Sequence, residues 1–315
     1  MRAFSAVVSL LAGLLLLAAS PGQSPNVGAQ EPPRQAGQRA LVLGGGGATG
    51  QAWEIGLLRG LRDAGVDLTE ADLIAGTSAG AILGARLRAG RSLDELYEGL
   101  SAPPAPGTGL DLSGVDLPYF QETARMWSGI DTTPALRIDV GRRALAATRV
   151  ISEDAWVQRW TTALGDPGWG SQPLVITAMD VLDGSTRLVD GTQGVPVARA
   201  VAASTALPGM IAPITIGDRR FMDGGLGGTH LDAAAGYGIV VGVTLRAATA
   251  REMGDLRVGG SQVTNVVPDA ESAAARGTDC LDRTRLPGTA EAGYRQAAAV
   301  AADLHGLWSG ASASR

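Results

Sequence analysis

Short apolar runs alternate with amphipathic stretches along most of this chain. Runs rich in valine, isoleucine and leucine are typical of buried strands, and apolar residues at helical spacing are typical of helices that pack on one face. The pattern predicts strands at 40–43, 73–75, 173–179, 186–189, 211–216, 220–222, 239–245 and 262–267. It predicts helices from about 50 to 65 and at 79–90, 93–100, 119–127, 152–164, 197–206, 270–276 and 291–308. This alternation favours one α/β domain.

The segment from Ser101 to Pro118 interrupts the alternation with prolines and glycines. These residue types break regular elements. Two interpretations stay open for the segment: a flexible lid over an apolar cleft, or a long surface connection.

The N-terminal stretch has the pattern of a secretory signal. Its first 29 residues carry one charge, at Arg2, followed by an apolar run from Ala6 to Ala19 that is short for a membrane span. Small residues at 27–29 suit cleavage before Gln30. We therefore expect a signal peptide at 1–29, a linker at 30–38, one domain at 39–309 and a disordered tail at 310–315. We therefore expect an exported protein. There are two alternatives: the N-terminal segment is an uncleaved membrane anchor, or the start codon is misassigned and the protein is cytoplasmic.

Charge and composition exclude several classes of protein. The chain carries a net charge of -5, and all 26 of its basic residues are arginine. Without lysine there is no Ser-Lys dyad, no Schiff base and no P-loop lysine. The dispersed arginines form no basic stripe, so we expect no nucleic-acid partner. The one cysteine, Cys280, cannot form an intrachain disulfide and is interpreted as a bystander thiol.

A glycine-rich loop follows the first predicted strand. Its residues Gly45, Gly47 and Gly50 match the G-x-G-x-x-G spacing of dinucleotide-binding loops. Such a site needs an acidic residue at the end of the second strand, whereas the acidic residues here precede that strand, so we expect no nucleotide. Successive glycines instead leave backbone N–H groups open to an oxyanion.

The second predicted strand leads into Gly76-Thr77-Ser78-Ala79-Gly80. A serine between two spaced glycines at a strand-to-helix junction is typical of a nucleophile elbow, in which a tight turn exposes the serine hydroxyl. Larger side chains at Gly76 and Gly80 would collide across that turn. The alternative is a helix N-terminus with a capping serine.

A nucleophilic serine needs a base within hydrogen-bond reach. The chain has two histidines, His230 and His305, and either is formally compatible with a Ser-His-acid triad. The other candidate is Asp223, which follows a predicted strand and precedes Gly224 and Gly225. Ser204, in the predicted helix at 197–206, is interpreted as a packing residue.

Four segments together resemble the patatin-like phospholipases. They are Leu43–Gly50, Gly76–Gly80, Ala203–Pro208 and Met222–Gly225, and the resemblance extends from Arg39 to the last predicted helix. It implies a three-layer α/β/α sandwich around a mostly parallel sheet, a Ser78–Asp223 dyad without histidine, and no metal or cofactor. It also implies an oxyanion hole from the backbone of Gly45, Gly46 and Gly47. Gly50, Gly76, Gly80, Gly224 and Gly225 support these motifs.

The resemblance implies lipid acyl hydrolysis, with a phospholipid or another acyl ester as substrate and a transient membrane surface as partner. Two departures bear on this expectation. Many members carry Arg or Lys at the position of Thr49, and many bacterial members have Asn-Ala-Asp where this chain has Thr229–Asp232. A lipid-binding or scaffold protein of the same fold, and a short-chain esterase or thioesterase, are the alternatives.

Overall fold

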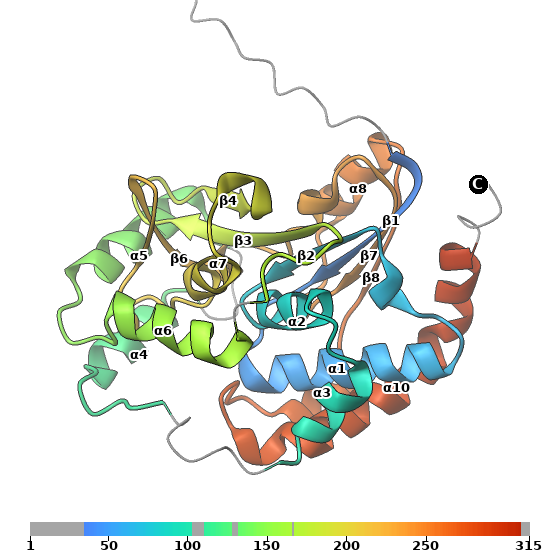
Figure 1. The fold of residues 1–315 in the computed structure, drawn as a ribbon, viewed down its shortest axis with the longest axis horizontal. Helices are drawn as coiled ribbons and strands as arrows, with labels where there is room; N and C mark the ends of the chain where they lie inside the picture. The colour runs from blue at the N-terminus through green and yellow to red at the C-terminus, as the bar shows by residue number, and fades with distance from the viewer. Residues whose placement is uncertain (1–34, 103–109, 128–131, 166, 310–315) are drawn as a thin grey trace, which may run out of the picture. The chain divides into compact units, whose positions relative to one another are not determined.

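The apolar runs of the chain form one mixed β-sheet in the computed structural model, which describes residues 35–102, 110–127, 132–165 and 167–309 (Figure 1). The strands are β1 Gln35–Leu43, β2 Leu73–Thr77, β3 Leu174–Asp180, β4 Thr186–Val189, β5 Ile214–Ile216, β6 Arg219–Asp223, β7 Tyr237–Val243 and β8 Gln262–Val266. Their order in the sheet is β5-β6-β3-β2-β1-β7-β8, with β4 paired to β3 outside this path.

Helices connect most of these strands. The α-helices are α1 Gly47–Asp63, α2 Ala79–Arg88, α3 Leu93–Gly99, α4 Leu117–Arg125, α5 Pro134–Ala146, α6 Glu153–Leu164, α7 Val197–Ser204, α8 Ala250–Val258, α9 Ala270–Arg276 and α10 Leu286–Ser309. Short 3₁₀ turns are η1 Leu68–Glu70, η2 Gly191–Gln193, η3 Gly224–Gly227, η4 Leu231–Ala234 and η5 Arg283–Arg285. All described residues lie in one compact unit, Pro32–Arg315.

The centre of the sheet is parallel and one side of it is antiparallel. Strand β1 pairs in parallel with β2 and β7, β2 with β3, and β7 with β8. Strand β3 pairs antiparallel with β4 and β6, and β5 with β6. The parallel β1–β2 pair brings the two loops that follow these strands to the same edge of the sheet, as expected for an open α/β sheet.

Helices cover both faces of the sheet, which confirms the predicted three-layer α/β/α arrangement. Successive residues of a strand point to opposite faces. In β1, Leu41 packs in the cluster that contains Trp53 of α1. Its neighbour Ala40 packs instead with Leu231 of η4 and Leu256 of α8.

Helices α1 and α10 lie side by side against the sheet (Figure 1). Their backbones approach so closely that a Cβ atom on Gly56 would lie 1.9 Å from the carbonyl oxygen of Ala290. A Cβ on Gly293 would lie 2.5 Å from the carbonyl oxygen of Trp53, whose indole N–H donates to Gln296 at 2.8 Å. This contact fixes α1, the helix that begins at the glycine loop.

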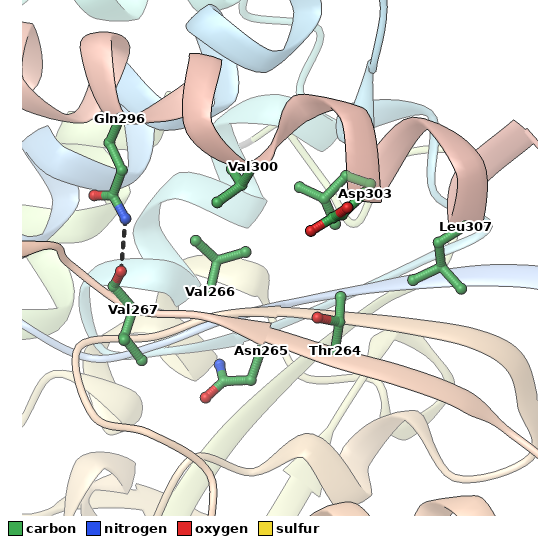
Figure 2. Close-up of a pocket in the computed structure, with 9 residues that line it drawn as sticks. Thr264, Asn265, Val266, Val267, Gln296, Val300, Asp303 and Leu307 are labelled. Atoms are coloured by element: carbon green, nitrogen blue, oxygen red, sulfur yellow. Dashed lines mark hydrogen bonds between the residues drawn. The ribbon is translucent and has the colours of Figure 1, made fainter.

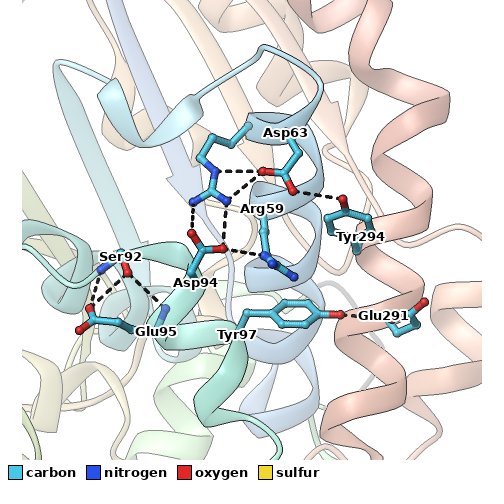
Figure 3. Close-up of polar contacts among 9 residues, drawn as sticks. Arg59, Asp63, Ser92, Asp94, Glu95, Tyr97, Glu291 and Tyr294 are labelled. Carbon is cyan, nitrogen blue, oxygen red and sulfur yellow. Dashed lines mark hydrogen bonds and ion pairs between the residues drawn. The ribbon is translucent and has the colours of Figure 1, made fainter.

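A polar network on the surface ties α3 and α10 to α1 (Figure 3). Asp94 of α3 accepts hydrogen bonds from Arg59 at 2.8 Å and from Arg62 at 3.0 Å. Tyr294 of α10 donates to Asp63 at 3.1 Å. The network therefore holds α1 in place from two sides.

Two helices, α5 and α8, are not predicted by the sequence pattern. Helix α5 buries Val140, Gly141 and Ala144, and α8 buries Leu256 alone, so neither carries a strong apolar stripe. The signals that mark them are local caps. Thr133 precedes a proline in the first turn of α5, and α8 begins with a capping box.

The two largest differences between predicted and observed boundaries lie at β1 and α10. Strand β1 begins at Gln35, inside the predicted linker, because Gln35 pairs with Tyr237 of β7. A register shift between Gln35 and Arg39 interrupts the apolar alternation that would have marked this part of the strand. Helix α10 begins at Leu286 and not at 291.

The predicted signal peptide at 1–29, the tail at 310–315 and residues 103–109 of the Pro/Gly-rich segment lie outside the described residues. The export signal therefore stays a prediction. No helix in the described part of the chain combines the length and apolar character that crossing a membrane requires.

Candidate active site

Ser78 occupies a strained turn between β2 and α2. Its backbone has φ 50° and ψ −111°, a combination that a residue with a side chain rarely adopts. A Cβ atom on Gly76 would lie 2.5 Å from the carbonyl oxygen of Gly80, and a Cβ on Gly80 would lie 2.3 Å from that of Leu43. The predicted strand–turn–helix and the collision across the turn at Gly76 are confirmed, whereas the space at Gly80 is limited by Leu43 of β1 and not by the turn.

The Ser78 hydroxyl donates a hydrogen bond of 2.7 Å to Oδ2 of Asp223, the last residue of β6. The other carboxylate oxygen of Asp223 accepts from the N–H of Gly225 at 2.8 Å. At Gly224 a Cβ atom would lie 2.7 Å from the carbonyl oxygen of Thr177 on β3. The glycine after Asp223 therefore lets the turn lie against the sheet.

Burial sets the acidity of this carboxyl group. Asp223 is 3% exposed. Because burial disfavours the charged form, it raises the pKa of Asp223 to about 6, against the opposing hydrogen bonds from Gly225 and Ser78. A carboxylate with a pKa near neutrality is a stronger base than an ordinary surface aspartate.

The last residue of α7 and the residues just after it support both members of this pair. Ser204 accepts a hydrogen bond of 2.8 Å from the backbone N–H of Ser78, and the carbonyl of Ala206 accepts one of 2.9 Å from the N–H of Asp223. The interpretation of Ser204 as a packing residue is therefore incomplete. A serine in a helix of alanines and valines was the available signal, because a buried hydroxyl needs a partner.

The glycine loop lies directly against the serine. A Cβ atom on Gly45 would lie 3.4 Å from Cβ of Ser78, and the N–H of Gly80 donates to the carbonyl of Gly44 at 2.9 Å. Within the described residues, the N–H groups of Gly45, Gly46 and Gly47 have no hydrogen-bond partner. Free donors therefore stand at the N-terminus of α1, where the helix dipole is positive.

Close packing explains the rest of the loop. A Cβ on Gly46 would lie 2.2 Å from the side chain of Leu245, and Gly47 has φ 64° with the carbonyl of Cys280 beside it. Thr49 is fully buried and is not among the residues that line the cleft described below. The Thr49 side chain is therefore turned away from the cleft.

Neither histidine forms a hydrogen bond with Ser78 or Asp223 in the described part of the chain. His230 is buried, and its Nε2 donates to the carbonyl of Gly224 at 2.7 Å. Burial lowers the pKa of His230, which favours the neutral ring. His305 is exposed on α10. His230 therefore holds the turn after Asp223, in the segment where the sequence departs from many bacterial members.

Ser78 and Asp223 open into a cleft of about 1240 Å³. Its apolar wall includes Ile82 of α2 and two tryptophans of α6, Trp156 and Trp160, whose rings meet edge to face at 5.7 Å. The Trp156 indole donates to Thr205 at 3.0 Å. This wall is suited to an apolar chain beside the reacting group.

A second hollow of about 300 Å³ lies between β8 and α10 (Figure 2). Gln296 crosses its end and donates to the carbonyl of Val267 at 2.7 Å. Asp303 is the ionisable group in its lining. The hollow has no nucleophile with a base beside it, so the Ser78 cleft is the candidate active site. No group of three His, Cys, Asp or Glu residues in the described ranges is arranged to hold a metal ion.

Glu54 is another buried carboxyl group, in α1, the helix that follows the glycine loop. It is 1% exposed, and neither carboxyl oxygen has a hydrogen-bond partner among the described residues. Burial raises the pKa of Glu54 well above its ordinary value of 4.5, and the nearby Gly44 N–H, which opposes this, already donates to Val243. The folded protein therefore keeps Glu54 protonated at a pH where the unfolded chain ionises it.

Glu54→Gln should make the protein less sensitive to high pH. Stability from a raised pKa is complete below about pH 4.5 and falls as pH rises through the folded-state pKa, by up to about 1.4 kcal/mol per pH unit. The free energy of unfolding of Glu54→Gln minus that of the wild type should therefore increase between about pH 4.5 and pH 8. Denaturant titrations measure it, with exposed Glu98→Gln as the control; a difference that does not change with pH would contradict the expectation.

Comparisons with known proteins agree with the sequence resemblance. Residues 41–231 match the family model described as patatin-like phospholipase, which confirms that resemblance. The comparison with curated proteins gave no match.

Solved structures of two proteins are similar to this chain. VipD from Legionella pneumophila aligns with a TM-score of 0.45 and 13% identity, covering 84% of this chain and 67% of that one. The type III effector protein ExoU aligns with a TM-score of 0.39 and 16% identity, covering 88% of this chain and 54% of that one. The structure of SpcU in complex with ExoU from Pseudomonas aeruginosa aligns with a TM-score of 0.33 and 19% identity. The alignment covers 81% of this chain and 52% of that one. The chain spans about half the length of these ExoU chains.

Proposed function

Because this chain belongs to the patatin-like phospholipase family, we propose that it is a serine hydrolase that cleaves lipid acyl esters with Ser78 as nucleophile and Asp223 as base. Membership supports lipid acyl hydrolysis at the level of the family. The observation that carries the finer assignment is the 2.7 Å hydrogen bond from the strained Ser78 to Asp223.

The reaction proceeds in two halves. Asp223 takes the Ser78 proton as Ser78 Oγ attacks the ester carbonyl, and the tetrahedral oxyanion accepts hydrogen bonds from the N–H groups of Gly45, Gly46 and Gly47. When the intermediate collapses, the ester C–O bond breaks and Asp223 returns the proton to the leaving alcohol. Asp223 then takes a proton from the water that attacks the acyl-enzyme. When this second intermediate collapses, the bond to Ser78 Oγ breaks, Asp223 returns the proton to that oxygen, and the fatty acid leaves.

The cleft supports an acyl chain longer than that of an acetate ester. Its apolar wall continues from Ile82 to Trp156 and Trp160, so burial of each further methylene stabilises the bound substrate by about 0.8 kcal/mol. A lipid substrate would reach this wall from a membrane or micelle surface.

Labelling by a fluorophosphonate tests the proposal. The purified protein should be labelled at Ser78, located by peptide mass spectrometry, because the reagent forms a stable phosphonyl ester only with an activated serine hydroxyl. Ser204→Ala keeps Ser78 and tests the positioning of its backbone, so it should be labelled more slowly. A folded protein that binds liposomes and is not labelled would instead be a lipid-binding protein of the same fold.

A further inference from the structure

The Ser78 cleft is lined by more positive than negative side chains. Among the described residues that line it, the acids are Glu95 and Asp223. The arginines are Arg86, Arg91, Arg159, Arg246, Arg276 and Arg283. In a chain with a net charge of -5, this concentration of positive charge makes the cleft attractive to anions.

Arg86 shares a face of α2 with the candidate nucleophile. Ser78, Ile82 and Arg86 are spaced by four residues, and all three line the cleft. At 1.5 Å per residue, Arg86 is about 12 Å along the helix from Ser78. Cα–Cβ bonds in a helix tilt toward its N-terminus, so the Arg86 side chain starts back toward Ser78. The stripe therefore offers a nucleophile, an apolar surface and a cation in that order.

Arg86 is half-buried beside other cations. In the described part of the chain it makes no hydrogen bond or ion pair through its side chain. Burial and the charges of Arg91 and Arg283 lower its pKa, and no acidic group opposes them. Arg91 is paired with Glu95 at 3.5 Å, whereas neither Arg86 nor Arg283 forms an ion pair with any residue that the structure describes.

Arg283 comes from η5, more than half the chain away from α2. Its charge also acts on Arg159 of α6, whose guanidinium lies 5.8 Å from the centre of the Trp156 ring. Arginine stems often pack over apolar surface, and that alone would explain Arg159. The juxtaposition of Arg86 and Arg283 is different, because α2 and η5 bring two like charges to the same cleft, which costs free energy that a bound anion would offset.

We propose that Arg86 and Arg283 form an anion subsite of the Ser78 cleft that binds the phosphate of an acyl ester substrate, so that anionic acyl esters are preferred over uncharged ones. This inference rests on the proposed hydrolase function. Guanidinium groups bind phosphate through paired, charge-assisted hydrogen bonds, and two of them can share one phosphate. The phosphate then sits at Arg86 while the ester reaches Ser78 and the acyl chain lies against the tryptophans.

The test compares two soluble substrates with the same acyl chain, a monoacyl glycerophosphate and the uncharged monoacylglycerol. The wild type should show the higher kcat/KM for the phosphate ester. Arg86→Gln and Arg283→Gln should each reduce that preference, Arg86→Gln by about tenfold, as expected for one charge-assisted hydrogen bond. Arg86→Lys keeps the charge and should keep part of the preference. Arg142→Gln, on the exposed side of α5, is the matched control and should keep all of it.

Direct binding separates this inference from the proposed function. Titration of the full-length Ser78→Ala protein should show tighter binding of the monoacyl glycerophosphate than of monoacylglycerol, and Arg86→Gln in that background should remove the difference. If the wild type hydrolyses neither ester but this binding difference is present, the subsite stands and the hydrolase function fails. If both esters are hydrolysed and no arginine variant alters their ratio, the function stands and the subsite is overturned.

Inorganic phosphate identifies the source of the bound group. Weak competition by phosphate in the wild type, absent in Arg86→Gln, supports the subsite. Inhibition at concentrations as low as those of the monoacyl glycerophosphate would assign the site to free phosphate and overturn a role in substrate choice. Melting temperatures of all variants check that each is folded.

Discussion

Ser78→Ala should reduce hydrolysis of a chromogenic fatty ester to the uncatalysed background, a loss on the order of 10⁴-fold or more. The substitution removes the only atom that attacks the carbonyl, while the oxyanion donors and the cleft remain. The backbone N–H of residue 78 still donates to Ser204, so the turn keeps its support. Initial rates of the purified variant, together with loss of fluorophosphonate labelling, measure the effect. Full activity in this variant would end the assignment of Ser78 as nucleophile.

Ser78→Gly is the matched variant, because it separates catalysis from backbone strain. Alanine at φ 50° keeps the strain of the wild type, whereas glycine adopts positive φ readily. Both variants should be inactive, and Ser78→Gly should melt at a higher temperature than Ser78→Ala, since strain of this kind costs about 1–3 kcal/mol. Equal melting temperatures would mean that the turn stores no strain.

Asp223→Asn should lower kcat/KM by about a hundredfold or more, as expected when a general base is removed. Asparagine keeps the shape of the side chain and can still accept from the Gly225 N–H, but it cannot take the Ser78 proton. The wild type needs ionised Asp223, whose pKa is about 6. Its kcat/KM should therefore rise with pH through about 6 and level off above it, and Asp223→Asn should lose this inflection. Rates between about pH 5 and pH 8 measure both effects.

The histidines supply the control for Asp223→Asn. His305→Gln alters an exposed residue of α10 and should leave the pH profile unchanged. His230→Ala removes the hydrogen bond to Gly224, so a moderate loss of activity with the inflection retained is expected. A loss as large as that of Asp223→Asn, with the inflection moved, would make a histidine the base and the dyad wrong.

The local chemistry of the site is readable from the sequence because it depends on neighbours in the chain. Glycine at 76 is required by a collision across one turn, and the structure confirms the strained strand–turn–helix around Ser78; glycine at 80 is required by the neighbouring strand β1. The glycine loop and the turn after Asp223 are also visible in the sequence, because each is a run of glycines just after a predicted strand. The catalytic roles of Ser78 and Asp223 stay predictions until the variants are measured.

Long-range contacts were not readable in this way. Ser204 lies in a helix whose composition indicates packing, yet it accepts the Ser78 N–H across 126 residues of sequence. His230 looks like a candidate base, and only its contact with Gly224 shows that it supports the turn. Helices α5 and α8 bury few apolar side chains, so their periodicity is too weak to predict them.

The sequence by itself determined the α/β class, the order of most strands and helices, and the three candidate catalytic motifs, because periodicity, glycine sterics and helix caps act within a few residues. Asp223 was implied by the family resemblance, but only tertiary structure showed that its carboxyl group meets Ser78, across 145 residues, and which arginines share the cleft. These contacts depend on how the strands pair in the sheet and on how α2, α6 and η5 meet at the cleft. The free energy of these contacts comes from burying side chains and from electrostatic interactions between nearby charges. Neither burial nor the distance between charges is defined until the chain has folded.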